Sequence, residues 1–343
     1  MKNFPFGSPA RFCIAAVVFL IPVTGNAIAQ SDHDYSAIAR SISETMREHH
    51  YNPAELQQTA FLEIEAEILA LAEEAESMEA FLSDFQEIWR TGPFSHVQLR
   101  PAQGTAAELA THLDNLDVGP GAVSLNWNEG IAILTVNTMM GNDTIEFIDE
   151  AYAEISARET EALIIDLREN GGGAFAIRPL VEHVINTPLD AGVFISQSWN
   201  ARMDRAPTFA DVRTIDPWTG WSIRDFWADV ETNLLTRMRF EPADDAFSGD
   251  VYVLVSSTTA SAAELATDAL NAAGATIIGE TTEGAMLSQK IYDIPGGLHL
   301  SLPIADYYSH HSGRIEGSGV VPDIEADSET AMEVALELAR TQQ

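Results

Sequence analysis

The spacing of apolar residues divides this chain into a helical part and a part in which strands alternate with helices. Between residues 31 and 90, apolar side chains recur every three or four positions, which is the period of one helix face. Pro53 separates the first helical stretch from the second, because a proline disfavours helical conformation in the residue before it. The pattern predicts three helices, with apolar faces at residues 38–46, 62–71 and 81–89. We expect them to form a small N-terminal cap over residues 30–92.

From about residue 119 the pattern changes to short and nearly continuous apolar runs. These runs predict strands at residues 131–136, 162–167, 251–255 and 275–279, with helices between them. Strands that are apolar on both faces are typical of a mostly parallel sheet with helices on both sides. We therefore expect an α/β domain over residues 93–327 and a C-terminal helix over residues 328–343.

Residues 199–250 fit neither period and are expected as an insertion into the α/β domain. The segment contains four of the six tryptophans of the chain. An irregular stretch of this length is more often a lid or a binding loop than a linker. Tryptophans are also common in packed cores, so a lid and a packed segment both stay open at this point.

The first 29 residues have the layout of a secretory signal peptide. Lys2 and Arg11 precede an apolar run at residues 12–21, and a small-residue pattern ends at Ala29. The run is too short for a comfortable membrane span, and Cys13 lies at its start, where a lipoprotein cleavage site does not fit. We expect cleavage after Ala29, no membrane anchor in the mature chain, and a periplasmic or extracellular location; the alternative is an uncleaved amphipathic anchor.

The charge of the chain excludes one large class of function. Lys and Arg number 18 against 52 Asp and Glu, which gives a formal net charge of −34. Such a chain repels the phosphate backbone, so no nucleic-acid partner is expected. The single cysteine excludes an internal disulfide and disfavours a thiolate metal site. No histidine cluster has metal-ligand spacing, so neither a metal nor another cofactor is expected.

Two junctions between a predicted strand and the following helix carry candidate chemistry. Three glycines, Gly171 to Gly173, follow the strand at residues 162–167, and their backbone N–H groups can form an anion-binding nest. Ser261 follows the strand at residues 251–255, with Glu264 three positions later. That spacing is typical of a capping box, which is the simplest interpretation of Ser261 by itself. A serine beside an oxyanion nest is, however, the arrangement that acyl transfer needs.

Four motifs in order resemble the C-terminal processing (tail-specific) serine peptidases, a family related to the tricorn protease core and to retinoid-binding repeats. The motifs are D-L-R-x-N-x-G-G at residues 166–173, T-A-S-A-x-E at 259–264, G-E-x-T-x-G at 279–284, and a loose match to G-R-x-I/V-E-G-x-G-V-x-P-D at 313–323. The resemblance implies a Clp-peptidase/crotonase-like fold. It also implies a serine endopeptidase that acts on unfolded or flexible polypeptides through an acyl-enzyme.

The resemblance assigns roles to particular residues. Ser261 would be the nucleophile, and the N–H groups of Gly172 and Ala262 would form the oxyanion hole, with Gly171 the less favoured donor. The processing enzymes use a lysine as base, but Ala285 stands at that position here. A hydroxyl needs some base to become a nucleophile, so another residue must take this role.

The tricorn-like branch of the family uses a Ser-His-Ser-Glu constellation, and this chain offers its parts. Ser95 and His96 precede the α/β domain's first strand, and Glu316 lies in the last motif. On this hypothesis His96 is the general base, Glu316 orients it and Ser95 assists. Lys290 stays open as an alternative, displaced base.

The segment before the first predicted strand indicates which branch of the family the chain resembles. Residues 97–122 are too few for the PDZ domain that many processing peptidases carry there. Substrate selection would then fall to the cap, to the tryptophan-rich segment or to enclosure in a homo-oligomer. A non-catalytic, retinoid-binding-like member of the same fold is the competing hypothesis.

Overall fold

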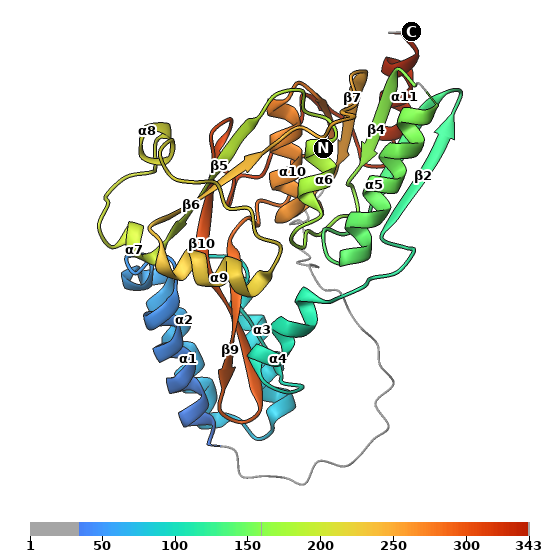
Figure 1. Cartoon of the computed structure of the whole chain (residues 1–343). Coiled ribbons are helices and arrows are strands. Elements are labelled where there is room, and N and C mark those ends of the chain that lie inside the picture. Colours follow the sequence, from blue (N-terminus) through green and yellow to red (C-terminus); the bar gives the residue numbers. More distant parts are fainter. Residues whose placement is uncertain (1–33, 159, 342–343) are drawn as a thin grey trace, which may run out of the picture.

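Two six-stranded β-sheets organise the part of the chain that the computed structural model describes, residues 34–158 and 160–341 (Figure 1). The expected signal peptide lies outside these residues. Within the described residues, no helix combines the length and the apolarity needed to cross a bilayer.

The first sheet is the one that the apolar runs predict. Its strand order is β12-β8-β7-β4-β3-β2, and all neighbours are parallel except β2 and β3. The strands are β2 (Val123–Asn128), β3 (Ile131–Val136), β4 (Ala162–Asp166), β7 (Asp250–Val255), β8 (Thr276–Gly279) and β12 (Ile324–Glu325). Its four central strands match the predicted ones, and the mostly parallel sheet is confirmed.

Helices cover both faces of this parallel sheet. On one side lie α5 (Asn142–Ala157), α6 (Ile177–Glu182) and α10 (Ala262–Ala272), whose apolar residues share one core cluster with the sheet. On the other side lies α11 (Ala331–Thr341), which buries Ala331, Ala335 and Ala339 against the outer face. The covering of the sheet on both faces explains why its strands are apolar without alternation.

The second sheet is antiparallel, and the sequence pattern did not predict it. Its main order is β1-β10-β5-β6, with β9 and β11 also pairing with β10. The strands are β1 (Gln98–Pro101), β5 (Leu189–Ser196), β6 (Leu235–Phe240), β9 (Ser288–Ile294), β10 (Leu298–Ser309) and β11 (Gly313–Arg314). β9 is largely accessible to solvent and β10 carries buried polar residues, so neither shows a clean apolar run.

The segment at residues 199–250 is partly built into this antiparallel sheet. It contains α8 (Phe209–Val212), α9 (Ile223–Thr232) and β6, and it begins in α7 (Gln197–Asn200). β6 pairs with β5 along most of its length, and Trp199 and Trp227 are buried. Trp221 is 46% exposed, so only part of the segment is free to contact other molecules.

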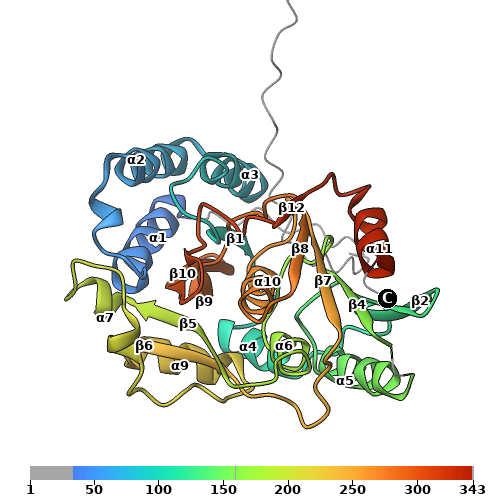
Figure 2. The same cartoon turned by 90° about the horizontal axis from the view of Figure 1, so that it is seen from above.

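The N-terminal cap consists of the three expected helices and a short turn. These are α1 (Tyr35–His49), η1 (Glu55–Gln57), α2 (Thr59–Glu74) and α3 (Met78–Trp89). Ile38, Phe85 and their neighbours form one apolar cluster with Leu300 and Leu302 of β10. The cap therefore packs on the outer face of the antiparallel sheet, as Figure 2 shows.

Helix α10, which follows Ser261, lies between the two sheets (Figure 2). It contacts β5 of the antiparallel sheet as well as β7 and β8 of the parallel sheet. A short connection with β1 and α4 (Ala106–Asp114) fills residues 97–122 between the cap and the parallel sheet. The carboxyl ends of β4 and β7 thus lead to the N-termini of α6 and α10, where sites in such sheets form.

Candidate active site

Ser261 occupies a sharp turn between β7 and α10. Its backbone has φ +56° and ψ −121°, a conformation that residues with a side chain rarely adopt. Among the described residues other than glycine, only His96, Glu129 and Ser261 have a positive φ. Two of these three are the predicted base and nucleophile. Strain of this kind costs about 1–3 kcal/mol at each residue and accumulates at functional sites.

Glu264 holds the Ser261 turn from inside the protein. Its carboxylate accepts the backbone N–H of Ser261 over 2.8 Å, which is its half of the predicted capping box. It also accepts the Thr282 hydroxyl at 2.6 Å and the N–H groups of Gly284 and Ala285 at 2.7 and 2.9 Å. Burial raises the pKa of Glu264 to about 6, against the effect of these donors. Glu264 is therefore a buried carboxylate that is ionised at neutral pH and accepts hydrogen bonds from four other residues.

Gly172 brings the glycine nest against Ser261. A Cβ at this position would lie 2.7 Å from Ser261 Cβ and 2.8 Å from the Ala260 carbonyl oxygen. Its φ of +96° also requires glycine. At Gly173, a Cβ would lie 2.4 Å from Met140 N. The predicted nest and Ser261 are thus in direct contact at Gly172, while Gly173 is needed for the close approach to Met139 and Met140.

The Gly172 N–H, expected to be an oxyanion donor, is already engaged. It donates to Asn170 Oδ1 over 2.9 Å, while Asn170 Nδ2 donates to the Val136 carbonyl at the same distance. The N–H groups of Gly171 and Gly173 donate to no acceptor in the described part of the chain, and neither does that of Ala262. The unengaged N–H groups at the two junctions are therefore those of Gly171, Gly173 and Ala262, and the expected Gly172 donor is not among them.

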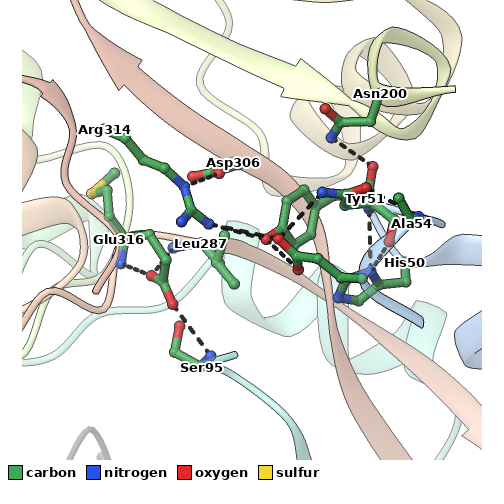
Figure 3. A network of polar contacts seen from close by, with 12 residues as sticks. His50, Tyr51, Ala54, Ser95, Asn200, Leu287, Asp306, Arg314 and Glu316 are labelled. Atoms are coloured by element: carbon green, nitrogen blue, oxygen red, sulfur yellow. Dashed lines mark hydrogen bonds and ion pairs between the residues drawn. The ribbon is translucent and has the colours of Figure 1, made fainter. Parts of the chain in front are cut away.

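Ser95, His96 and Glu316 form a continuous chain of hydrogen bonds. The Ser95 hydroxyl lies 2.6 Å from His96 Nδ1, and the Ser95 N–H donates to Glu316 Oε1 at 3.3 Å. The Ser95 side chain also opposes the rise that burial causes in the pKa of the Glu316 carboxyl. Glu316 Oε2 accepts the N–H groups of Met286 and Leu287 at 2.6 and 3.2 Å (Figure 3). Residues 221 positions apart in the sequence, Ser95 and Glu316, thus meet at one carboxylate.

Burial decides the charge states along this chain. It lowers the pKa of His96 to about 4, so the imidazole is neutral at pH 7 and can accept a proton. It raises the pKa of Glu316, while the hydrogen bonds from Met286 and Ser95 oppose that shift. With Nδ1 facing Ser95, the Nε2 atom of His96 is left for another partner.

The loop at residues 284–287 joins the Ser261 side of the site to the Glu316 side. Ala285 donates its N–H to Glu264, and the next residue, Met286, donates to Glu316. Ala285 stands where the processing enzymes have their lysine, so that position lies between the two carboxylates. Ser261 Oγ and His96 make no hydrogen bond to each other in the described structure. Such contacts are often long in unliganded enzymes and tighten with substrate.

Lys290, the alternative base, is occupied elsewhere. Its Nζ pairs with both carboxylate oxygens of Glu231 on α9, at 2.6 and 2.7 Å, and lies 5.3 Å from the centre of the Tyr292 ring. Within the described residues, Lys290 makes no hydrogen bond to Ser261. Among the described residues, no group of three acidic, histidine or cysteine side chains is arranged to hold a metal ion.

Sequence analysis does not reveal the roles of Glu264 and Asn170, whose side chains hold the backbone N–H groups of Ser261 and Gly172. Glu264 was interpreted as a capping residue only, although its place in the T-A-S-A-x-E motif was visible. Asn170 lies in the glycine motif, but nothing in its spacing indicates that its side chain occupies the Gly172 N–H. Both roles depend on contacts between distant segments, which no local pattern records.

Comparison with known proteins finds a matching family model and two curated relatives. Residues 130–326 match the family model described as peptidase family S41. The C-terminal processing peptidase of the Tetradesmus obliquus chloroplast is 29% identical over 191 residues, covering 55% of this chain and 33% of that protein. A carboxyl-terminal-processing protease of Picosynechococcus sp. is 24% identical over 226 residues, covering 65% of this chain and 46% of that protein. The chain thus spans less than half the length of either curated relative.

Among solved structures, the tricorn protease has a similar fold. It aligns with a TM-score of 0.55 at 12% identity and covers 90% of this chain and 37% of that chain. This likeness confirms the expected Clp-like α/β fold. The family model spans more than half of the sequence and includes Ser261, Glu316 and the glycine nest. The chain belongs to peptidase family S41.

Proposed function

We propose that this protein is a serine endopeptidase in which Ser261 is the nucleophile and His96 the general base. The observation that carries the proposal is the chain from Glu316 through the Ser95 hydroxyl to His96 Nδ1. It places a hydroxyl at Nδ1 of a neutral imidazole and leaves Nε2 as the atom that accepts a proton, which is the arrangement that a general base requires. A non-catalytic binding protein of the same fold would gain nothing from this row of hydrogen-bonded residues. No observation in the structure favours the binding-protein hypothesis.

The reaction begins with attack of Ser261 Oγ on the carbonyl carbon of the peptide. His96 Nε2 takes the hydroxyl proton, and the carbonyl electron pair moves to oxygen. When the tetrahedral intermediate collapses, the C–N bond breaks and His96 returns the proton to the leaving amine. Water then repeats both steps on the acyl-enzyme, which releases the new carboxyl end and restores Ser261.

The oxyanion is bound by backbone N–H groups at the N-terminus of α10 and in the nest. Ala262 supplies one free donor, and Gly171 or Gly173 supplies the other, because Asn170 already holds the Gly172 N–H. These donors are fixed before substrate arrives, so no reorganisation is needed when the charge develops. Removing one such donor in other enzymes typically costs about a factor of 10²–10³ in kcat.

The substrate class is an unfolded or flexible polypeptide, in keeping with relatives named as processing proteases. We also propose that the protein is exported and that residues 1–29 are its signal peptide. Within the described residues, the tryptophan-containing loop before α9 lies near the nest, because Trp218 stacks on Phe175 at 5.6 Å. That loop is a candidate contact for substrate side chains.

Labelling with a fluorophosphonate probe tests the proposal without knowledge of the natural substrate. The probe is expected to modify Ser261, identified by mass spectrometry of the digested protein. Labelling should be lost in Ser261→Ala and slowed in His96→Ala, and should be unchanged in Lys290→Ala and in Ser257→Ala, a nearby serine that serves as control. Equal labelling of the wild type and Ser261→Ala would refute the assignment of the nucleophile.

A further inference from the structure

The proposed base and the carboxylate that orients it come from separate segments. One corner of the cap contacts both segments. Ser95 and His96 lie in the connection from α3 to β1, whereas Glu316 follows β11. We define the cap corner as residues 50–55, between the end of α1 and the start of η1. Figure 3 shows it beside Arg314 and Asp306, in one polar network with Glu316 and Ser95.

The first contact holds the segment that carries the base. Phe94 directly precedes Ser95 and is 8% exposed. Its ring centroid lies 4.2 Å from that of His50 in the cap corner and 5.2 Å from that of Trp89 in α3. Because His96 has a φ of +64°, the segment has little freedom to compensate for a displaced Phe94. The His50 ring therefore helps to set where Ser95 and His96 lie.

The second contact holds the segment that carries the carboxylate. Arg314, two residues before Glu316, donates from Nε to Asp306 Oδ2 over 2.6 Å and from Nη2 to the Tyr51 hydroxyl over 3.2 Å. The Tyr51 hydroxyl in turn donates to Glu55 Oε2 over 2.7 Å. Burial raises the pKa of Glu316, and the charge of Arg314 opposes that rise. The cap corner thus sets the direction of Arg314, and with it the start of the Glu316 segment.

The cap corner is itself fixed to the body of the protein through its backbone. The Tyr51 N–H donates to the Pro303 carbonyl of β10 over 3.1 Å, and its carbonyl accepts Asn200 Nδ2 over 2.9 Å. Gln197 Nε2 donates to the His50 carbonyl over 3.0 Å. A displacement of the corner would therefore reach both segments at once.

The polar groups at this place are not optimised for stability. His50 Nε2 and Asp306 Oδ1 are buried and have no hydrogen-bond partner among the described residues. The two side chains are 0% and 1% exposed. Burial of an unpartnered polar atom costs free energy, and such atoms in native proteins call for an explanation other than packing. Burial also raises the pKa of Asp306 to about 7, against the effect of Arg314.

We propose that the cap corner positions the base and its carboxylate relative to each other, with Tyr51 and Arg314 as positioning residues. The inference rests on the proposed function, since it concerns the same chain from Glu316 to His96. The position of Ser261 does not depend on the cap corner, because Glu264 and α10 hold Ser261 through contacts that the cap corner does not make. Loss of the cap contacts should impair the base and leave the nucleophile and the oxyanion donors in place.

Nitrogen NMR of the His96 ring tests the proposal without requiring peptidase activity. In Arg314→Gln and Tyr51→Phe, the His96 Nδ1 resonance should move, because the hydrogen bond to Ser95 is disturbed; Arg314→Lys should restore it in part. Arg237→Gln is the matched control, since Arg237 is buried and pairs with the half-buried Asp190 in the same sheet. Tyr292→Phe is the control for a tyrosine hydroxyl on a glutamate. Both controls should leave the resonance unchanged.

The kinetic counterpart separates chemistry from binding. With casein as substrate, Tyr51→Phe should lower kcat by about 10-fold and Arg314→Gln by about 100-fold, with KM within about twofold of the wild type. Unchanged His96 resonances in both variants, with melting temperatures close to the wild type, would overturn the positioning role even if the protein is a peptidase. Shifted resonances in a protein that cleaves nothing would support positioning and refute the proposed function.

Discussion

Glu264 accepts the backbone N–H of Ser261 over 2.8 Å while it also holds the loop that reaches Glu316. The nucleophile turn and the loop at the position of the missing lysine therefore share one buried carboxylate. In Glu264→Gln, one carboxylate oxygen becomes an NH₂ group that faces N–H donors instead of accepting them.

We expect Glu264→Gln to lower the free energy of unfolding by about 1–3 kcal/mol at pH 7.5 and to reduce kcat. Urea denaturation and casein cleavage measure the two effects. Glu280→Gln is the matched control, because its more exposed carboxylate also accepts a backbone N–H, that of Ser257. Equal losses of stability and of casein cleavage in the two variants would show that Glu264 contributes no more than a partly exposed hydrogen-bond acceptor.

The nest glycine at position 172 tolerates no side chain. Gly172→Ala would place a methyl group 2.7 Å from Ser261 Cβ, in a backbone conformation with φ +96°. The strain alone costs about 1–3 kcal/mol, and the overlap must displace the nucleophile. We expect a folded but inactive protein or a failure to fold, judged by circular dichroism and fluorophosphonate labelling. Gly297→Ala, which meets nothing within 4 Å at φ +71°, controls for strain without overlap; labelling of Gly172→Ala at the wild-type rate would contradict the predicted contact.

Much of the parallel sheet was predictable from the sequence, because strands buried on both faces leave continuous apolar runs such as 162–167 and 251–255. The antiparallel sheet was not, since β9 is half-exposed and β10 carries buried polar groups such as Asp306. Motifs located Ser261 and the nest, but the resemblance was needed to select Ser95, His96 and Glu316. Which N–H groups stay free depends on Asn170, and that contact exists only in the folded chain.

The pH dependence of activity should reflect the burial of His96. A general base works in its neutral form, and the pKa of His96 is lowered from 6.5 to about 4. The acid limb of kcat/KM should therefore lie below pH 6.5. Measurement of kcat/KM between pH 4 and 9 checks this, and an acid limb at or above pH 6.5 would contradict the lowered pKa of His96.

The stability of the protein should also depend on pH through His50. Burial lowers its pKa from 6.5 to about 4, so the unfolded chain binds a proton that the folded chain does not bind between these values. This contribution to stability is present above pH 6.5 and is lost as the pH falls towards 4, by up to about 3 kcal/mol. In His50→Phe it cannot titrate. Chemical denaturation of the two proteins at pH 7.5 and 5.0 should show the variant losing less stability on acidification, and an equal loss would contradict burial of a neutral imidazole.

The central claim is that His96 activates Ser261, and degradation of a disordered protein tests it most directly. The purified protein should degrade casein, and both Ser261→Ala and His96→Ala should lose this activity by about 10³-fold or more while Lys290→Ala retains it. The activity of Glu316→Gln should lie between that of His96→Ala and that of Lys290→Ala. Retained cleavage in His96→Ala, together with loss in Lys290→Ala, would contradict the account and assign the base to the lysine.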